Sequence, residues 1–147
     1  MNNTQVSSTE AQASSDRTIF SLLHAARALE DRLEASLATV GLSMPKFSVL
    51  TELVSSANAL PLSDLANRLS CVRSNMTQLV DRLEADGLVK RVDDPTDRRI
   101  VQAALTDEGR ARQAAGAAEV AKLHEEFAAQ TGAEDRAALL RLLTALK

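Results

Sequence analysis

The stretch "VRSNMTQLVDRLEADGLVKRVDDPTDRRIVQAAL", residues 72–105, decides the fold. Its first half predicts a helix over 72–86, because apolar residues recur there at the three- and four-residue spacing of one helix face. That face consists of Val72, Met76, Leu79, Val80 and Leu83. Gly87 then suits the left-handed conformation that commonly ends a helix. The apolar flanks "LVKRV" and "IVQAAL" predict a β-hairpin directly after the helix.

The hairpin tip, residues 93–99, concentrates charge in a short turn. Pro95 fixes its own φ and holds Asp94 in an extended conformation. The four residues that begin at Asp94 are therefore predicted to form a type I β-turn. Arg98 and Arg99 follow it, so the tip displays two adjacent guanidinium groups.

A short helix, "DLANRL", precedes the helix of 72–86 after a three-residue break, and Ser63 is its expected N-cap. Two helices joined by a tight turn and followed by a hairpin form a winged helix-turn-helix. The outer face of the second helix carries hydrogen-bonding side chains near its N-terminus, where a recognition helix meets base edges and phosphate. These candidates are Arg73, Ser74, Asn75, Thr77, Gln78 and Arg82. The alternative is a solvated polar face that binds nothing.

The segment "LSDLANRLSCVRSNMTQLVDRLEADGLVKRVDDPTDRRIVQAALTDEG" resembles the DNA-binding region of the MarR family of bacterial transcriptional regulators. The run "VDRLEADGLVKR" and the wing "DPTDRR" are close to the family pattern in order and spacing. The resemblance is strong over residues 61–109. Outside that span it rests on helix order, chain length and the segment "GLSMPKFSVL".

The resemblance implies a homodimer whose N- and C-terminal helices intertwine and which binds pseudo-palindromic operators, as a ligand-responsive repressor. Each recognition helix would enter a major groove, and each wing the flanking minor groove. The base readers that it implies are Ser74, Asn75 and Gln78. Arg99, with Arg98, would probe the minor groove, while Asp97 would hold an arginine in position and Asp94 would support the wing.

Two positions depart from the family pattern. The family usually has glycine at the position of Ser70 and a serine or threonine cap at the position of Val72. The turn therefore lacks its usual left-handed residue, and the recognition helix lacks its usual cap. Neither change removes an expected DNA contact.

Helices are expected on both sides of this region. Residues 1–15 are polar and rich in serine, which predicts a disordered tail. A long helix is predicted from Asp16 to a C-terminal Gly41. A second helix follows, with Ser43 as its N-cap and Pro45 in its first turn. Its inner stripe is expected to contain Phe47, Leu50 and Val54.

After the wing, Thr106 or Asp107 is expected to cap a long alanine-rich helix that ends at Gln130. Gly132 separates it from a last amphipathic helix. The expected fold is mainly α with a small β-hairpin wing. The expected parts are a tail (1–15), N-terminal helices (16–60), the winged helix-turn-helix (61–106) and C-terminal dimerisation helices (107–147).

Composition narrows the functional classes. Aromatic residues make up 2% of the chain, so the core must be aliphatic, and a single cysteine excludes an intrachain disulfide. The sequence contains no apolar run long enough to span a bilayer and no signal peptide, so the cytoplasm is expected. The net charge is −3, but residues 61–106 carry seven cations and seven anions, so the remainder is the acidic part.

Other residues are weaker candidates. His24 and Arg27 share one side of the first helix and, with Phe47, could bind a small anionic aromatic effector; the alternative is an exposed face where Arg27 pairs with Asp31. Cys71 is either a redox switch or, as we favour, a structural residue packed into the turn.

Metal and enzyme chemistry find no support in the sequence. His124 is interpreted as part of a solvated helix face, so neither a metal nor a cofactor is expected. No phosphate loop or nucleophile motif indicates an enzyme. An acidic adaptor that binds protein is a third class, and the arginine tip and polar helix face argue against it.

Overall fold

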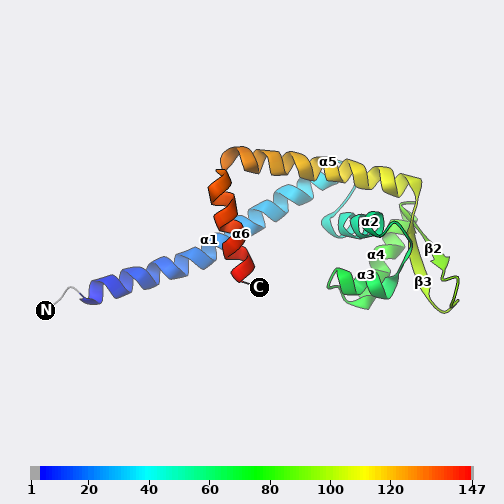
Figure 1. The fold of residues 1–147 in the computed structure, drawn as a ribbon, viewed down its shortest axis with the longest axis horizontal. Helices are drawn as coiled ribbons and strands as arrows, with labels where there is room; N and C mark the ends of the chain where they lie inside the picture. The colour runs from blue at the N-terminus through cyan, green and yellow to red at the C-terminus, as the bar shows by residue number, and fades with distance from the viewer. Residues whose placement is uncertain (1–3, 147) are drawn as a thin grey trace.

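The computed structural model describes the backbone of residues 4–146 and the side chains of residues 17–146. Figure 1 shows a lobe of short helices and strands at one end and long helices that extend away from it. The elements in chain order are α1 (Thr4–Ala38), α2 (Met44–Ser56), β1 (Leu60–Pro61), α3 (Leu62–Arg68), α4 (Arg73–Ala85), β2 (Val89–Asp93), β3 (Val101–Leu105), α5 (Asp107–Gln130) and α6 (Ala133–Ala145). The predicted winged helix-turn-helix, mainly α with a small sheet, is confirmed.

The N-terminal helix starts earlier than the sequence predicted. Helix α1 begins at Thr4, so the expected disordered tail over residues 1–15 is wrong for the part from residue 4 onward. Adding a residue to an existing helix costs far less than starting one, and the alanine, glutamine and glutamate in this stretch are good helix formers. The prediction failed because it relied on apolar periodicity, whereas the extension of an existing helix does not require such a pattern. Residues 1–3 lie outside the described residues.

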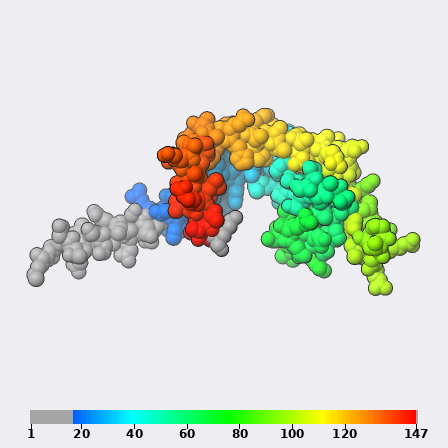
Figure 2. Space-filling view, in the orientation of Figure 1, coloured from blue at the N-terminus to red at the C-terminus, as the bar shows by residue number. Residues whose placement is uncertain are grey.

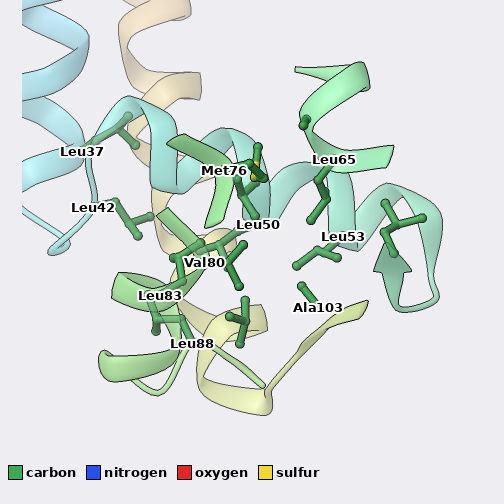
Figure 3. Packing of buried hydrophobic residues seen from close by; sticks show 14 residues of the cluster. Leu37, Leu42, Leu50, Leu53, Leu65, Met76, Val80, Leu83, Leu88 and Ala103 are labelled. Atoms are coloured by element: carbon green, nitrogen blue, oxygen red, sulfur yellow. The ribbon is translucent and has the colours of Figure 1, made fainter. Parts of the chain in front are cut away.

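The core of the lobe is aliphatic, as predicted. Leu50, Leu65 and Val80 are completely buried and come from three different helices. Leu88 and Ala103 close the cluster from the wing side (Figure 3). In α2 the buried residues are Val49, Leu50 and Leu53, whereas Phe47 and Val54 are only half-buried, so the expected stripe was shifted around the helix.

The sheet has three antiparallel strands in the order β1-β3-β2. In the wing, Val89 pairs with Leu105 and Asp93 pairs with Val101. The two-residue strand β1 pairs Leu60 with Ala103, and the sequence did not predict this strand. A two-residue strand is recognised only through its pairing with another strand, because two residues are too few to show an alternating pattern in the sequence.

The ends of three helices follow local chemistry. Gly41 and Gly87 both have a φ of +72° and end α1 and α4 as predicted. The Leu88 N–H donates to the Leu83 carbonyl (2.9 Å), which completes the expected cap. The prediction for α3 was wrong, because its N-cap is Pro61 and Ser63 lies inside its first turn.

Helix α5 joins the lobe to the distal helices. The Thr106 hydroxyl caps it by accepting the Gly109 N–H (2.9 Å), and the helix ends at Gln130 as predicted. Its buried residues are Gly109 and Gly116. A Cβ on Gly109 would lie 1.9 Å from the Leu88 carbonyl oxygen, so only glycine permits this approach.

The distal helices form an open arch with the lobe. Figure 2 shows α6 and the lobe on either side of a hollow beneath α5. No residue of α6 is buried, and Leu37 is the buried residue of α1 among those whose side chains the structure describes. Within the described residues no helix is long and apolar enough to cross a membrane.

Candidate nucleic-acid interface

The turn between α3 and α4 is held by backbone hydrogen bonds. The Cys71 N–H donates to the Ala66 carbonyl (2.8 Å), and the Ser70 N–H donates to the Asn67 carbonyl (3.2 Å). Ser70 adopts a φ of +50°, a conformation that favours glycine. The sequence therefore located the left-handed position correctly, and a serine occupies it under strain.

The outer face of α4 is free to meet a ligand. Each of the residues proposed from the sequence is exposed: Arg73, Ser74, Asn75, Thr77, Gln78 and Arg82. The Thr77 hydroxyl donates to the Arg73 carbonyl (3.0 Å), one turn earlier in the same helix. No ion pair within the described part of the chain involves Arg73 or Arg82, so both guanidinium groups are available.

Val72 is not part of the core. It was assigned to the apolar face of α4, but its side chain is 66% exposed. The residue is the N-cap of α4, with φ −67° and ψ 139°, and the Met76 N–H donates to its carbonyl (3.0 Å). Helical periodicity does not apply to a residue outside the helical φ and ψ range, which explains the error.

The acidic residues at the rear of α4 form ion pairs with basic residues from other elements, two cations for three carboxylates. Arg91 in β2 contacts Asp81 (2.6 Å) and Glu84 through its guanidinium group. Its backbone N–H also donates to Glu84 (3.1 Å). These hydrogen bonds from Arg91, the backbone one first, hold the pKa of the Glu84 carboxyl below its ordinary value. Lys46 in α2 pairs with Asp86.

Asp94 organises the start of the wing tip. One of its carboxylate oxygens accepts the hydroxyl and the N–H (2.7 Å) of Thr96 and the N–H of Asp97 (3.1 Å). The other accepts the side-chain amide of Gln102. The hydrogen bonds from Thr96, the hydroxyl first, lower the pKa of the Asp94 carboxyl. The proposed role of Asp94 in wing support agrees with this geometry.

The tight turn of the wing lies three residues later than predicted. The Ile100 N–H donates to the Asp97 carbonyl (2.9 Å), which places Arg98 and Arg99 at the two central positions of a turn over 97–100. The turn expected to begin at Asp94 lacks its backbone hydrogen bond, because the Asp94 carboxylate rather than its carbonyl accepts the Asp97 N–H.

Asp97 holds the backbone of Arg99 rather than its side chain. The Asp97 carboxylate accepts the Arg99 N–H (3.0 Å). Neither Arg98 nor Arg99 forms a guanidinium hydrogen bond or ion pair with the described residues. The backbone of the tip is therefore fixed while both charged groups remain in solvent.

Comparison with known proteins agrees with this arrangement. The MarR family model matches residues 42–101, and the HTH-type transcriptional regulator PrsX of Escherichia coli is 33% identical over 88 residues, or 59% of this chain and 53% of PrsX. The transcriptional repressor CouR bound to a 23-mer DNA duplex superposes with a TM-score of 0.76 at 33% identity, over 86% of this chain and 89% of CouR. The chain belongs to the MarR family.

A second solved relative has the same fold. A single-residue mutant of MarR from Escherichia coli, in complex with operator DNA, gives a TM-score of 0.77 at 27% identity, covering 88% of this chain and 93% of that one. The chain spans about half the length of the curated relatives that it matches first. The relatives are regulators of transcription, and the MarR family is not an enzyme family.

The residues proposed for an effector do not meet in this MarR-family chain. His24 and Arg27 are both exposed on α1, and Arg27 forms no ion pair with Asp31 among the described residues. Phe47 packs on α5, where a Cβ at Gly116 would lie 2.8 Å from its ring. None of the three residues lines the cavity of about 640 Å³ between α1, α5 and α6.

Cys71 is half-buried and packs against the core of the lobe. Its thiol lies 3.5 Å from the Val72 carbonyl oxygen. This position is consistent with the structural role favoured from the sequence. His124 is exposed on α5, and no cluster of potential metal ligands occurs within the part of the chain that the structure describes.

Proposed function

We propose that the chain is a sequence-specific DNA-binding regulator that acts as a homodimer, with α4 in the major groove and the wing in the adjacent minor groove. The observation that carries the proposal is the division of charge around α4. Free arginines lie at the leading end of the helix and at the wing tip, while the acids at the rear are paired. Support also comes from two relatives that were solved on DNA.

The ion pairs explain how an acidic chain can bind a polyanion. Residues 61–106 are neutral in total, which alone would give little attraction to phosphate. Arg91 offsets Asp81 and Glu84, and Lys46 from outside the segment offsets Asp86. Within the described structure, the cations of this segment that form no ion pair are Arg73, Arg82, Lys90, Arg98 and Arg99. These free cations can contact phosphate locally, while Asp93, Asp94 and Asp97 of the wing also form no ion pair among the described residues.

The homodimer is supported by apolar surface that one chain leaves exposed. On α1, Ile19, Phe20 and Leu23 are each about 60% exposed, and on α6 Leu140 and Leu142 are 65% and 66% exposed. Monomeric proteins rarely expose apolar patches of this extent. A second copy related by a two-fold axis would cover them and would place two recognition helices about one turn of DNA apart.

A ligand-responsive repressor is the most economical regulatory role. CouR is named a transcriptional repressor, and CouR from Rhodococcus jostii RHA1 was also solved with p-coumaroyl-CoA. We propose that a small anionic aromatic effector stabilises a conformation of this chain that does not fit DNA. The effector must bind that conformation more tightly than the DNA-bound one for the equilibrium to shift.

Two substitutions test the division of labour between helix and wing. Gln78→Ala should cost about 1–3 kcal/mol of binding and relax preference at one base pair per half-site. Arg99→Ala should weaken binding to every operator and lower the salt dependence by about one unit of slope. Lys122→Ala is the control for a change of one unit of charge, because it removes a cation from the middle of α5, where Lys122 pairs with Glu119. Binding is measured by gel shift against an operator library at two salt concentrations.

The outcomes separate the parts of the proposal. If Arg99→Ala binds DNA as tightly as the wild type does, the wing does not probe DNA, since the Arg99 side chain bonds to none of the described residues. If the wild type selects no DNA sequence from the library, the proposed function itself is wrong. Adding aromatic carboxylates to the same gel shift tests the effector, and release of DNA is the expected result.

A further inference from the structure

The most exposed large apolar side chain of the lobe lies at the leading end of the recognition helix. Val72 is 66% exposed, compared with 38% for Ile100 and 39% for Val101 in the wing. It immediately precedes Arg73 and Ser74 on the surface proposed to face DNA. Exposure of an apolar side chain to water is unfavourable, and the fold does not bury this one.

The backbone fixes where this side chain points. The Val72 carbonyl oxygen accepts the Met76 N–H (3.0 Å) and lies 3.5 Å from the Cys71 thiol, so the backbone of the residue is held at the start of α4. Valine is branched at Cβ and has few accessible rotamers. Its two methyl groups are therefore presented at a defined place beside the N-terminus of α4, with little entropy left to lose on contact.

The major groove offers one apolar partner to such a group. Among the edges of the four bases in that groove, only thymine presents a methyl group, and apolar side chains contact it. Because a recognition helix meets base edges with its N-terminal residues, an N-cap side chain lies within that zone. Among the candidate residues on this face, Thr77 also carries a methyl group, but it lies more than one turn further along α4.

We propose that Val72 contacts the 5-methyl group of a thymine and makes thymine the preferred base at one position in each half-site. The inference rests on the proposed function, since it requires α4 to lie in the major groove. It adds a specificity-determining residue to the polar readers of the same helix. It also gives a role to the departure from the family's serine or threonine at this position.

A purely structural role for Val72 makes a different prediction. The side chain borders a groove of about 440 Å³ between α2 and the turn before α4, so it could stabilise the lobe by packing there. In that case shortening the side chain would lower stability and would affect all DNA sequences equally. Thymine recognition predicts an effect on one base and none on the others.

Three variants separate these roles: Val72→Ser, Val72→Thr and Val72→Ala. Serine and threonine can both accept the Asn75 N–H, a bond that α4 now lacks at its cap, so both should raise the Tm. Of these two, only threonine keeps a γ-methyl group. For Val72→Ser, the thymine preference should therefore be lost while the Tm rises. A packing role would instead lower both the Tm and the affinity for DNA.

The experiment uses the full chain and a duplex that the wild type selects from a random library. Each thymine is replaced in turn by uracil, which removes the methyl group alone. For the wild type and Val72→Thr, one replacement per half-site should weaken binding about fourfold, the value of burying one methyl-sized group. Val72→Ser should bind the thymine and uracil duplexes equally, and Val72→Ala, which keeps only the β-carbon methyl, should show a smaller difference than the wild type.

Each other result overturns the inference. It fails if uracil leaves wild-type binding unchanged at every position, or if the thymine preference survives in Val72→Ser. It also fails if Val72→Ser lowers the Tm and weakens all duplexes alike. The failure of the proposed function is distinct, because the wild type would then select no sequence from the library.

Discussion

The winged lobe and the long helices of this chain differ in how completely they fold on their own. Among the described side chains, the buried aliphatic core lies between Leu37 and Ala103, and α6 buries none of its residues. In the lobe, five-residue strands and short helices surround Leu50 and Val80 on all sides. The long helices contact the rest of the chain on one side and expose leucines on the other.

This difference shows that the apolar pattern of a helix does not reveal what will cover it. Leu50 and Leu53 of α2 are three residues apart, as are Leu140 and Leu143 of α6. The leucines of α2 are buried, whereas those of α6 are exposed. The second copy of the chain in the proposed homodimer would cover the leucines of α6 and remove this difference. The following predictions test that asymmetry, beginning with the largest effect.

The double substitution Leu139→Glu and Leu143→Glu should abolish the dimer and leave the lobe folded. Two charges in the apolar face of α6 cannot be buried without a large desolvation cost. DNA affinity should fall by about 100-fold or more, because two linked half-sites become two independent ones. Analytical ultracentrifugation measures the association state, and gel shift measures binding.

Arg141→Glu is the matched control for this variant. It lies in the same helix, is exposed, and changes the net charge of the chain by the same two units. It should remain dimeric. If the double variant sediments as a dimer, the exposed leucines of α6 are not the interface.

A core substitution should behave differently from a distal one. Leu50→Ala should lower the free energy of unfolding by about 2–5 kcal/mol at every protein concentration, because it opens a cavity among fully buried side chains. Leu140→Ala should lower the Tm at micromolar concentration and have no effect on dilution below the dimer dissociation constant. Thermal melts over a concentration series compare them. Equal effects at all concentrations would remove the contrast between the regions.

The sequence predicted the elements that local chemistry determines. Gly41 and Gly87 end their helices as expected, and Thr106 caps α5, because each depends on the few residues around it. It could not predict the pairing of Arg91 with Asp81, ten residues earlier, because that contact exists only after the wing folds back on α4.

The candidate site was predicted in part for the same reason. The outer face of α4 follows from helical periodicity and is exposed as expected. Val72 was misplaced because it lies just outside the helix, and the wing turn was misplaced because the Asp94 side chain competes with the backbone for the same N–H. The expected effector site required His24 and Arg27 to lie close to Phe47 of another helix, and the sequence alone does not give such tertiary distances.

The lobe should become more stable when its strained turn is relieved. Ser70→Gly should raise the free energy of unfolding by about 1 kcal/mol, because glycine adopts the left-handed conformation of this residue (φ +50°) without steric cost. Ser43→Gly is the control at φ −112°, where glycine only adds flexibility and should lower stability. Denaturant unfolding measures both. A destabilised Ser70→Gly would show that the serine is not strained.

The smallest expected effect is a local pH dependence of the wing. The pKa of Asp94 is lowered in the folded chain, so its contribution to stability is fully present above the ordinary carboxyl pKa and is lost as the pH falls below about 4. Glu84 acts in the same direction at the base of the wing, because its pKa is lowered as well. The amide signals of Thr96 and Asp97 should therefore shift in an NMR titration below this pH.

Asp94→Asn separates the charge from the hydrogen bonds. The amide oxygen can still accept the N–H groups of Thr96 and Asp97 but does not titrate in this range. The Thr96 amide signal should then stay constant down to a pH of about 3, below the ordinary carboxyl range. A titration unchanged from the wild type would assign the transition to another carboxyl group.

Helix α5 gives the molecule a mechanical lever. At one end, the Thr106 hydroxyl bonds to Gly87 and Leu88, and Gly109 and Gly116 seat the helix on the lobe. From Gly116 to Gln130 it continues for about 20 Å to the corner with α6, and Arg32 of α1 pairs with Glu126 in this part. In the proposed homodimer, a displacement of α6 would therefore reach the wing through a single continuous helix. The spacing of the two wings could then change while the contacts inside each lobe stay the same.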